Sequence, residues 1–478
     1  MQFSDLPPEL LIMIVDHYML DPQTFATARQ RLRHTLLLGI IDRGLRYFVL
    51  LEPRCRFLWS TIHLQWPPGV VDLYLRRSQG RPLSVSLNVG SSHALNSKID
   101  RWSSFLFENM SMIASLDICI RNKQCSVGLA QSLDTPAPLL QSFTLSLGHN
   151  VELVKGFFSG FAPKLVSAHI NTRQMFNLSC FPTIRVLKMQ VDPYAHTPLL
   201  PTLAALSQLE ELTLIGIRDP SRIDASEYLY IERYPFPQAF PPMQIWLPAC
   251  RSLTLKNLET PFVHGFLSTI HLSHIQVLAI HETVVRGGYR DSFGWFPPTI
   301  AQPFPYIPLN PISPNFIRLI LNPDSIYIQT DGTPSYTFSI DLRSLHSLSG
   351  DGVEDLQTQI ADILLMLTGQ LSVRPHELII VNNAGRGRPE RPMSALDEVH
   401  FEQLWHHVLP FYGTVETLRL GGNVTAVVEA VCNSQTPLLL PFLSEIEITE
   451  KPAICALDGT RLIELLELHR PGPSSSFA

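Results

Sequence analysis

Apolar residues recur along most of the chain with one spacing: an apolar residue, two others, a second apolar residue, one other, and a third apolar residue. The alternation at the last two apolar positions is typical of a half-buried strand. The copies are Leu140/Phe143/Leu145, Leu165/Ala168/Ile170, Ile184/Leu187/Met189, Leu209/Leu212/Leu214, Cys250/Leu253/Leu255, Ile275/Leu278/Ile280, Phe316/Leu319/Leu321, Pro375/Leu378/Ile380, Val415/Leu418/Leu420 and Leu443/Ile446/Ile448. This pattern predicts a series of short strands between residues 140 and 448.

The distances between copies indicate how these strands are connected. Between middle positions the steps are 25, 19, 25, 41, 25, 41, 59, 40 and 28 residues. Leucine-rich repeats have roughly 20–29 residues, so five of the steps fit one repeat closely. Steps near 40 fit a repeat with an insertion, and the step of 59 fits two repeats or one repeat with a long insertion.

Units of this size cannot bury their own apolar side, and stacking them produces one continuous core. The sequence therefore predicts an irregular leucine-rich-repeat-like solenoid with a curved parallel sheet. The leucines at equivalent inward positions are Leu187, Leu212, Leu253, Leu278 and Leu418. A conventional α/β domain is the alternative, because strands that alternate with helices also form parallel sheets.

The N-terminus predicts a helix of another character. Asp5 suits a helix cap, and Pro7 and Pro8 suit the first turn. The apolar residues that follow cover nearly the whole circumference, with Glu9 and Asp16 forming one narrow polar stripe. A helix of this kind is buried on more than one side, either in its own core or against a second protein.

The segment Leu6-Pro7-Pro8-Glu9-Leu10-Leu11, followed by Ile14-Val15, resembles the opening of an F-box of the variety common in fungal proteins, and the resemblance covers roughly residues 4–64. Asp21-Pro22 offers a second helix start, and Arg43-Gly44-Leu45-Arg46 occupies the basic stretch. Two features depart from the family: Leu45 stands where tryptophan is usual, and the Val-Cys pair before it is missing. By this resemblance the residues that bind the adaptor are Leu6, Pro7, Leu10, Leu11, Ile14 and Trp59.

Residues 67–134 predict helix and strand units that connect the two regions. Val70–Ser78 fits a helix that ends at Gly80, and Leu83–Val89 alternates strictly, as a half-buried strand does. A second helix is expected over Lys98–Met112 and a second strand over Ser115–Ile120. The run Leu75 to Leu83 resembles a segment that follows the F-box in many mushroom-type fungal proteins.

Composition limits the function classes. The chain has 478 residues, a net charge of −6 and a pI near 6.3, which argues against nucleic-acid binding as its main role. No apolar run long enough to span a membrane and no secretory pattern is present in the sequence. The seven scattered cysteines lack a Cys-x-x-Cys pair and indicate free thiols in a reducing compartment. A cytoplasmic or nuclear location is expected.

Two insertions rich in proline and aromatic residues interrupt the repeats, Tyr234–Pro248 and Trp295–Pro314. In the second, prolines recur every third residue, which is the period of polyproline II. One interpretation is a docking strip for a partner, and the other is a stiff loop packed on the array. For docking, the candidate target-binding residues are Trp295, Phe296, Phe304 and Tyr306.

The sequence contains no complete motif for catalysis, cofactor binding or metal binding. The chain has no nucleophile elbow of the Gly-x-Ser-x-Gly type, no phosphate loop and no dinucleotide fingerprint. Two histidine clusters, His264/His271/His274/His281 and His400/His406/His407 with Glu402, lack the converging ligands of a zinc site. Within the first, His271 and His274 would share a helix face. Arg386-Gly387-Arg388-Pro389 resembles the core of an AT-hook, but a solvated loop is the better interpretation.

These observations predict an α/β fold with a small all-helical N-terminal F-box module, residues 1–66, connecting units over 67–134, the repeat-like array over 135–470 and a flexible tail over 471–478. The resemblance implies a non-catalytic substrate-recognition subunit of an SCF (Skp–cullin–F-box) E3 ubiquitin ligase. Its partners would be the Skp-type adaptor with its cullin-RING ligase and an unknown target protein, with no nucleic acid, membrane, metal or cofactor. Alternatives are a solenoid scaffold with a degenerate F-box and, less favoured, an enzyme on an unrecognised fold.

Overall fold

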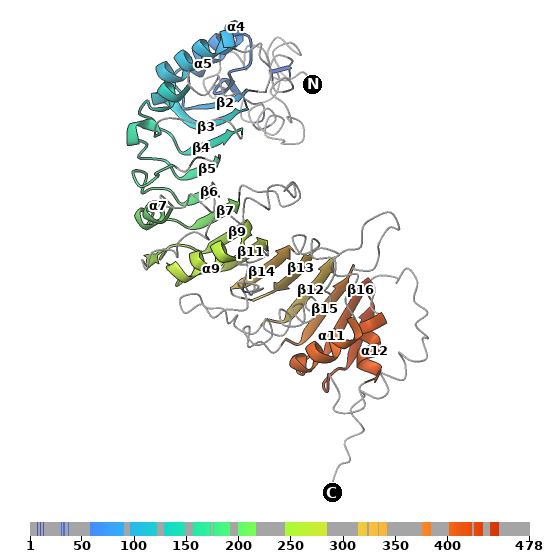
Figure 1. Cartoon of the computed structure of the whole chain (residues 1–478). Coiled ribbons are helices and arrows are strands. Elements are labelled where there is room, and N and C mark those ends of the chain that lie inside the picture. Colours follow the sequence, from blue (N-terminus) through green and yellow to red (C-terminus); the bar gives the residue numbers. More distant parts are fainter. Residues whose placement is uncertain are drawn as a thin grey trace. The chain divides into compact units, whose positions relative to one another are not determined.

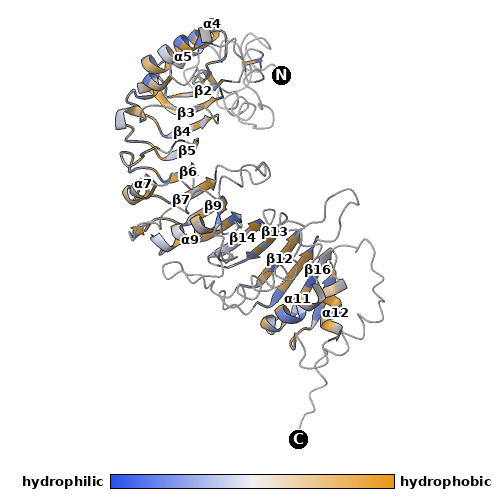
Figure 2. Cartoon of the chain, in the orientation of Figure 1, coloured by the Kyte–Doolittle hydropathy of each residue, from blue (hydrophilic) through white to orange (hydrophobic). Residues whose placement is uncertain are grey.

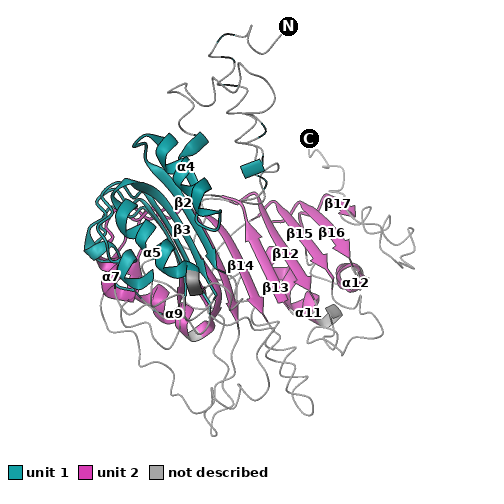
Figure 3. Cartoon of the chain, turned by 90° about the horizontal axis from the view of Figure 1, so that it is seen from above, with its two compact units in different colours: residues 1–189 teal, residues 190–478 magenta. Residues whose placement is uncertain are grey.

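A computed structural model describes residues 58–89, 96–121, 129–148, 156–191, 199–216, 244–283, 314–341, 375–383, 401–422, 425–433 and 440–448, with gaps at 173, 175, 323–324 and 333, and isolated positions 7, 10, 13, 30, 32, 33 and 37. Within these residues the main sheet comprises fifteen strands. The chain divides into two compact units, residues 1–189 and 190–478, which Figure 3 distinguishes by colour.

Unit 1 contains a sheet whose strands follow one another in sequence order. Each strand pairs in parallel with the next. The strands are β1 Thr61–His63, β2 Leu83–Val89, β3 Ile113–Ile120, β4 Ser142–Leu147, β5 Ser167–Asn171 and β6 Val186–Val191. Their side chains alternate between buried and part-exposed, so one face of the sheet forms the core and the other is polar.

The helices of unit 1 confirm the elements predicted for residues 67–134. Helix α4, Pro68–Ser78, begins with a proline in its first turn and ends where Gln79 and Gly80 adopt positive φ angles of 49° and 77°. Helix α5, Asn96–Asn109, continues into the short 3-10 helix η4, Met110–Met112. Trp102 of α5 is buried and donates its indole N–H to the carbonyl of Leu64 at 2.7 Å, which fixes the helix to the sheet. A further 3-10 turn, η5, spans Phe158–Gly160.

A repeated turn precedes many of the strands and explains how each strand is aligned with its neighbour. Three residues before the first apolar position, a carbonyl accepts a hydrogen bond from the N–H of that position, as in a β-turn. The pairs are Ala137–Leu140, Ala162–Leu165, Phe181–Ile184, Leu206–Leu209, Leu247–Cys250, Tyr412–Val415 and Leu440–Leu443, at 3.0–3.2 Å. Proline occupies the second turn position in several copies, where its fixed φ suits the turn: Pro138, Pro163, Pro182, Pro248 and Pro441.

Unit 2 contains nine of the strands, in the order β7-β9-β11-β14-β13-β12-β15-β16-β17. Their bounds are β7 Glu211–Gly216, β9 Ser252–Glu259, β11 Val277–Thr283, β12 Phe316–Asn322, β13 Ser325–Thr330, β14 Ser335–Asp341, β15 Glu377–Asn382, β16 Thr417–Gly422 and β17 Glu445–Ile448. Separately, β8 Ile245–Trp246 pairs in parallel with β10 Ile270–His271. The helices are α7 Leu199–Ala205, α9 Thr260–Thr269, α11 Phe401–Val408, η9 Leu409–Tyr412 and α12 Thr425–Asn433.

Three strands of unit 2 follow one another across the sheet in reverse sequence order, and the middle one, β13, is antiparallel to its neighbours. After β11 the chain does not form the next neighbouring strand; β12 pairs with β15, and β13 and β14 return by antiparallel pairing until β14 lies parallel to β11. Figure 1 shows β14, β13 and β12 in this reversed order between β11 and β15. Tyr336 of β14, rather than a leucine of the predicted pattern, is the partner of Leu278.

The predicted fold class is therefore wrong. The described residues form an α/β structure with a large, mostly parallel sheet, and the reversed strands break the succession that a repeat solenoid requires. Of the predicted all-helical N-terminal module, residues 1–66, the structure describes isolated positions and residues 58–66, and the latter contain strand β1, which pairs with β2. The physical reason for the error is that apolar triplets specify strands but not their order in a sheet.

The five leucines predicted at inward positions are confirmed as buried strand residues, whereas in the last copy Ile446 is part-exposed and Ile448 is exposed. Leu212, Leu253 and Leu278 are aligned on three neighbouring strands, and Leu378 is aligned with Leu418. In unit 1, Leu187 is aligned with Ala168. All of these residues are buried. Figure 2 shows that hydrophobic colour follows the strands, whereas α4 and α5 are mixed.

One register was predicted incorrectly. The pattern placed Leu319 at the middle position of its copy, equivalent to Leu378. The strands instead align Ile317 with Leu378, and Leu319 with Ile380. A shift of two residues keeps the same face buried, so the hydrophobic pattern alone does not distinguish the two registers.

Candidate interaction surface

The polar face of unit 1, defined as the strand side chains that alternate with the buried ones, carries a row of serines. Ser84, Ser115, Ser142 and Ser167 are in register on β2 to β5, and each is part-exposed. Each serine directly precedes the inward residue of its strand, so the sequence contained this signal although the apolar pattern alone did not reveal it. Adjacent strands lie about 4.8 Å apart, so the row presents closely spaced hydroxyl groups.

A second row on the same face contains ionisable groups. His63, Ser86, Asp117, Thr144, His169 and Lys188 are in register on β1 to β6. Ser86 and His63 are hydrogen-bonded between Oγ and Nδ1, and the His63 ring contacts Trp66 edge-on with centroids 4.8 Å apart. The row thus combines an acid, two histidines and a lysine along one direction.

Partial burial on the sheet changes the pKa of two of these groups. Burial raises the pKa of the Asp117 carboxyl above its ordinary 3.8, and His169 opposes the rise. Burial lowers the pKa of His169 below its ordinary 6.5, and Lys188 lowers it further, whereas Asp117 opposes the change. At neutral pH the row therefore favours a neutral His169 beside a charged Lys188.

The arrangement of Ser86, His63 and Asp117 differs from that of a hydrolase. In a Ser-His-Asp triad the carboxylate contacts the histidine and orients it. Here Asp117 is the neighbour of Ser86 on the side away from His63. The row is therefore better suited to hydrogen bonding with a ligand than to activating a serine nucleophile.

Unit 2 repeats the pairing of lysine with histidine. On its polar face, defined in the same way, Lys256 of β9 is in register with His281 of β11, and Ser339 of β14 is the next residue in the row. Burial lowers the pKa of His281, and Lys256 lowers it further. The adjacent row contains Thr213, Thr254, Ala279 and Thr337.

The last strands of unit 2 carry an ion cluster on the same face. Arg419 of β16 lies between two carboxylates: Nη1 is 2.7 Å from Oε1 of Glu377, and Nε is 2.6 Å from Oε2 of Glu447. Glu377 Oε1 and Arg419 Nε have no partner that meets the geometry of a hydrogen bond. The contacts are therefore ion pairs by distance only. With 42% of the Arg419 side chain exposed, solvent screening keeps their contribution to stability small.

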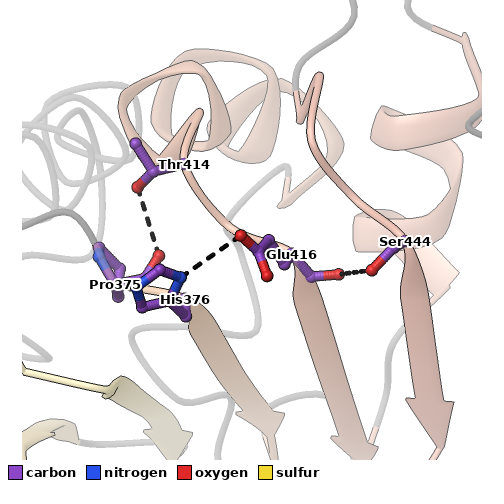
Figure 4. A network of polar contacts seen from close by, with 5 residues as sticks. All are labelled: Pro375, His376, Thr414, Glu416 and Ser444. Atoms are coloured by element: carbon purple, nitrogen blue, oxygen red, sulfur yellow. Dashed lines mark hydrogen bonds and ion pairs between the residues drawn. The ribbon is translucent and has the colours of Figure 1, made fainter. Parts of the chain in front are cut away.

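A polar network connects the starts of β15, β16 and β17 (Figure 4). His376 Nδ1 is 3.5 Å from Glu416 Oε1, and both side chains are largely exposed. Thr414 donates its hydroxyl to the carbonyl of Pro375 at 3.3 Å, and Ser444 donates to the carbonyl of Glu416 at 3.0 Å. Because these contacts join successive strands, the network is best explained as alignment of the strands.

The predicted adaptor-binding residues fall into three groups. Pro7 and Leu10 are exposed, with Leu10 at 45%. Leu6, Leu11 and Ile14 lie outside the described residues. Trp59 is 3% exposed and packs inside this chain. Its ring meets Tyr74 edge-on at 4.9 Å, and the Arg77 guanidinium lies 4.5 Å from its centroid.

The predicted target-binding residues Trp295, Phe296, Phe304 and Tyr306 lie outside the described residues, as does most of both proline-rich insertions. Among the described strand residues that alternate with the buried ones, four are part-exposed: Thr213, Thr254, Ala279 and Arg419.

The histidine clusters are dispersed. His271 lies in β10 and stacks on Trp246 with ring centroids 4.0 Å apart, whereas His274 follows in a bend, so the prediction that they share a helix face is wrong. His406 and His407 lie in α11, while His400 and the AT-hook-like Arg386–Pro389 are outside the described residues. Among the described residues, no group of three or more His, Cys, Asp or Glu side chains could hold a metal ion.

No protein-family model matches the chain, and no curated protein matches it. Within the described part of the chain, every helix is too short or too polar to cross a membrane.

Proposed function

We propose that the chain is a non-catalytic substrate-recognition subunit of an SCF E3 ubiquitin ligase. In this proposal the F-box-like segment, residues 4–64, binds the Skp-type adaptor, and the polar face of the sheet binds a target protein. The observation that carries the second part is the breadth of the polar face, on which in-register rows of hydroxyl, imidazole and ammonium groups alternate with a fully buried core. Such rows supply many hydrogen bonds with adjustable specificity.

The first part is supported by the resemblance at Leu6 to Val15 and by the exposure of two apolar side chains in this segment, Leu10 at 45% and Met13 at 65%. Exposed apolar side chains on a helical segment are typical of a surface that a partner covers.

A scaffold whose F-box no longer binds the adaptor is the second candidate. Two observations favour it. Leu45 replaces the usual tryptophan of the family, and Trp59 is buried against Tyr74 and Arg77 within this chain. In this case the polar face would still bind a partner protein, but without a link to ubiquitin transfer.

Co-purification of the full chain with the Skp-type adaptor tests the proposal. The double variant Leu10→Ala with Ile14→Ala should abolish co-purification, because truncating an anchoring aliphatic side chain costs about 2–5 kcal/mol in a well-packed interface. Val166→Ala is the matched control, since Val166 is another exposed aliphatic residue, at 40%, directly before β5.

Three results are distinguishable. Adaptor binding by the wild type and the control, but not by the double variant, supports the ligase role. Undiminished binding by the double variant would overturn the assignment of the two residues. No binding by the wild type would favour the scaffold.

A further inference from the structure

Lysine and histidine are paired in the same way in both units. In unit 1, Lys188 of β6 is in register with His169 of β5, and in unit 2, Lys256 of β9 is in register with His281 of β11. Each pair lies on the polar face of its own unit, on two neighbouring parallel strands. Each pair places two side chains that donate hydrogen bonds, an ammonium and an imidazole, next to each other, and an anionic ligand would complement this arrangement.

We propose that each Lys–His pair binds a carboxylate of an acidic, extended peptide segment in the target protein. The inference rests on the proposed function for the existence of a target, and it adds the chemistry that the target must present. A carboxylate between the ammonium and the imidazole accepts a charge-assisted hydrogen bond from the lysine and a second bond from the imidazole N–H.

The charge of each pair favours a carboxylate over a doubly charged anion. Because burial and the neighbouring lysine lower the histidine pKa, each pair carries about one positive charge at neutral pH, that of the lysine. One carboxylate neutralises this charge. An extended peptide presents every second side chain to the same face, so acidic residues at alternate positions would point toward the sheet together.

The neighbours of each pair are mainly hydroxyl groups that can complete the binding site. His169 has Thr144 beside it on β4, and His281 has Ser339 beside it on β14. Asp117, two strands from His169, is the acidic group that raises the pKa of this histidine. Asp117 therefore partly offsets the positive charge of the Lys–His pair in unit 1. The pair in unit 2 should bind the carboxylate more tightly.

Binding should depend on pH. A bound carboxylate stabilises the protonated imidazole and raises its pKa, so affinity should increase as the pH falls from 8 to 6. Glutamate remains ionised over this range because its ordinary pKa is about 4.3. Between pH 8 and 6, therefore, the change in affinity reports on the histidines and not on the peptide.

The experiment uses the full chain with ring-labelled histidine and a peptide of alternating glutamate and serine. The matched control peptide carries glutamine in place of glutamate. The histidine ring signals are followed by nuclear magnetic resonance, and His169→Gln and His281→Gln identify the two signals. The glutamate peptide should raise the pKa of both histidines, and the glutamine peptide should leave them unchanged.

The Lys188→Ala and Lys256→Ala variants test the pairs one at a time. Each should weaken binding of the glutamate peptide about threefold to fivefold, as expected for one part-exposed ion pair. Lys164→Ala is the control for net charge, because Lys164 is an exposed lysine in the turn before β5. Melting temperatures equal to that of the wild type confirm that the variants are folded.

The proposal is overturned if the glutamine peptide binds as well as the glutamate peptide, or if Lys164→Ala weakens binding as much as the two strand variants do. Either result can be obtained while co-purification with the adaptor is intact. A failure of the carboxylate sites is therefore distinguishable from a failure of the proposed ligase role.

Discussion

The two units form strands from the same apolar pattern but assemble them differently. In unit 1 the strands are neighbours in sequence order, from β1 to β6. In unit 2 the order is reversed over β12, β13 and β14, and the pairing there becomes antiparallel. The long segment 284–313 separates β11 from β12, whereas the repeated turn leads directly into β4, β5 and β6. A short turn therefore places each strand beside the strand that precedes it in the sequence, whereas a long connection allows the next strand to take another place in the sheet.

The polar faces also differ. In unit 1 small hydroxyl side chains dominate the exposed rows, and they occupy aligned positions on neighbouring strands. In unit 2 the outward positions of β12 and β15 include Ile320, Ile379 and Val381, each part-buried. Apart from Glu377 at its start, the outward positions of β15 are thus apolar. A binding surface made of hydroxyl rows is therefore better developed in unit 1.

Replacing glycine at the strand ends should have the largest effect and should separate the two units. In unit 2, a Cβ at Gly216 would lie 1.8 Å from the carbonyl oxygen of Asn257, and one at Gly422 would lie 2.1 Å from that of Asn382. Backbone must move in both cases, and Gly422 also has a φ of +79°. Gly216→Ala and Gly422→Ala should each lower the free energy of unfolding by about 3–5 kcal/mol.

Gly148→Ala in unit 1 is the comparison for these variants. Its Cβ would lie 3.2 Å from Arg121 Cα, so a small shift suffices, and the expected loss is about 1 kcal/mol. Denaturant unfolding of the three variants measures the difference. Equal losses in both units would show that close approach between strand ends is not particular to unit 2.

The sequence predicted the elements from α4 to β6 well because each is specified by neighbouring residues. Pro68 and Gly80 mark the ends of α4, and strict alternation marks Leu83–Val89. The polar rows follow from the same alternation once the register is known. Register is conveyed by the turn before each strand, for example Ala162–Leu165, and proline at its second position is the signal that the apolar pattern did not use.

The order of strands in unit 2 could not be predicted in the same way. The pattern at Leu319 identifies a strand but contains no information about which strand lies beside it. On the side of β14 the partner of Leu278 is Tyr336, which belongs to no copy of the pattern, and 58 residues separate the two in the chain. The Lys–His pairs were missed for the same reason, since His169 and Lys188 become neighbours only through the pairing of β5 with β6.

A smaller effect is expected from the ion cluster of unit 2. Arg419→Met should reduce the free energy of unfolding by about 1 kcal/mol or less, because 42% of the Arg419 side chain is exposed to solvent. A double-mutant cycle with Glu447→Gln measures the coupling of the pair, which should fall when salt is raised. Lys188→Met in unit 1 should cost less, because this lysine lies beside a histidine rather than between carboxylates. A larger loss from Lys188→Met would reverse the comparison.

The smallest effects are those of pH. The folded-state pKa values of His169 and His281 are lowered from the ordinary 6.5, mainly by burial and then by the adjacent lysines. In this pH range the unfolded chain binds more protons than the folded chain, so stability rises with pH. The fold should lose stability as the pH falls through about 6.5 toward the lowered values, and lose no more below them.

Single variants assign this loss to the two units. His281→Gln should flatten the dependence of unfolding free energy on pH between 8 and 5, measured by denaturant unfolding at constant ionic strength. His169→Gln should flatten it less, because Asp117 partly offsets the shift of His169. Asp117→Asn acts in the opposite direction: burial raises the pKa of this carboxyl, so its charge opposes folding above about 3.8, and removing the charge should stabilise the fold at pH 7. An unchanged pH profile for His281→Gln would show that its imidazole titrates as freely in the folded chain as in the unfolded one.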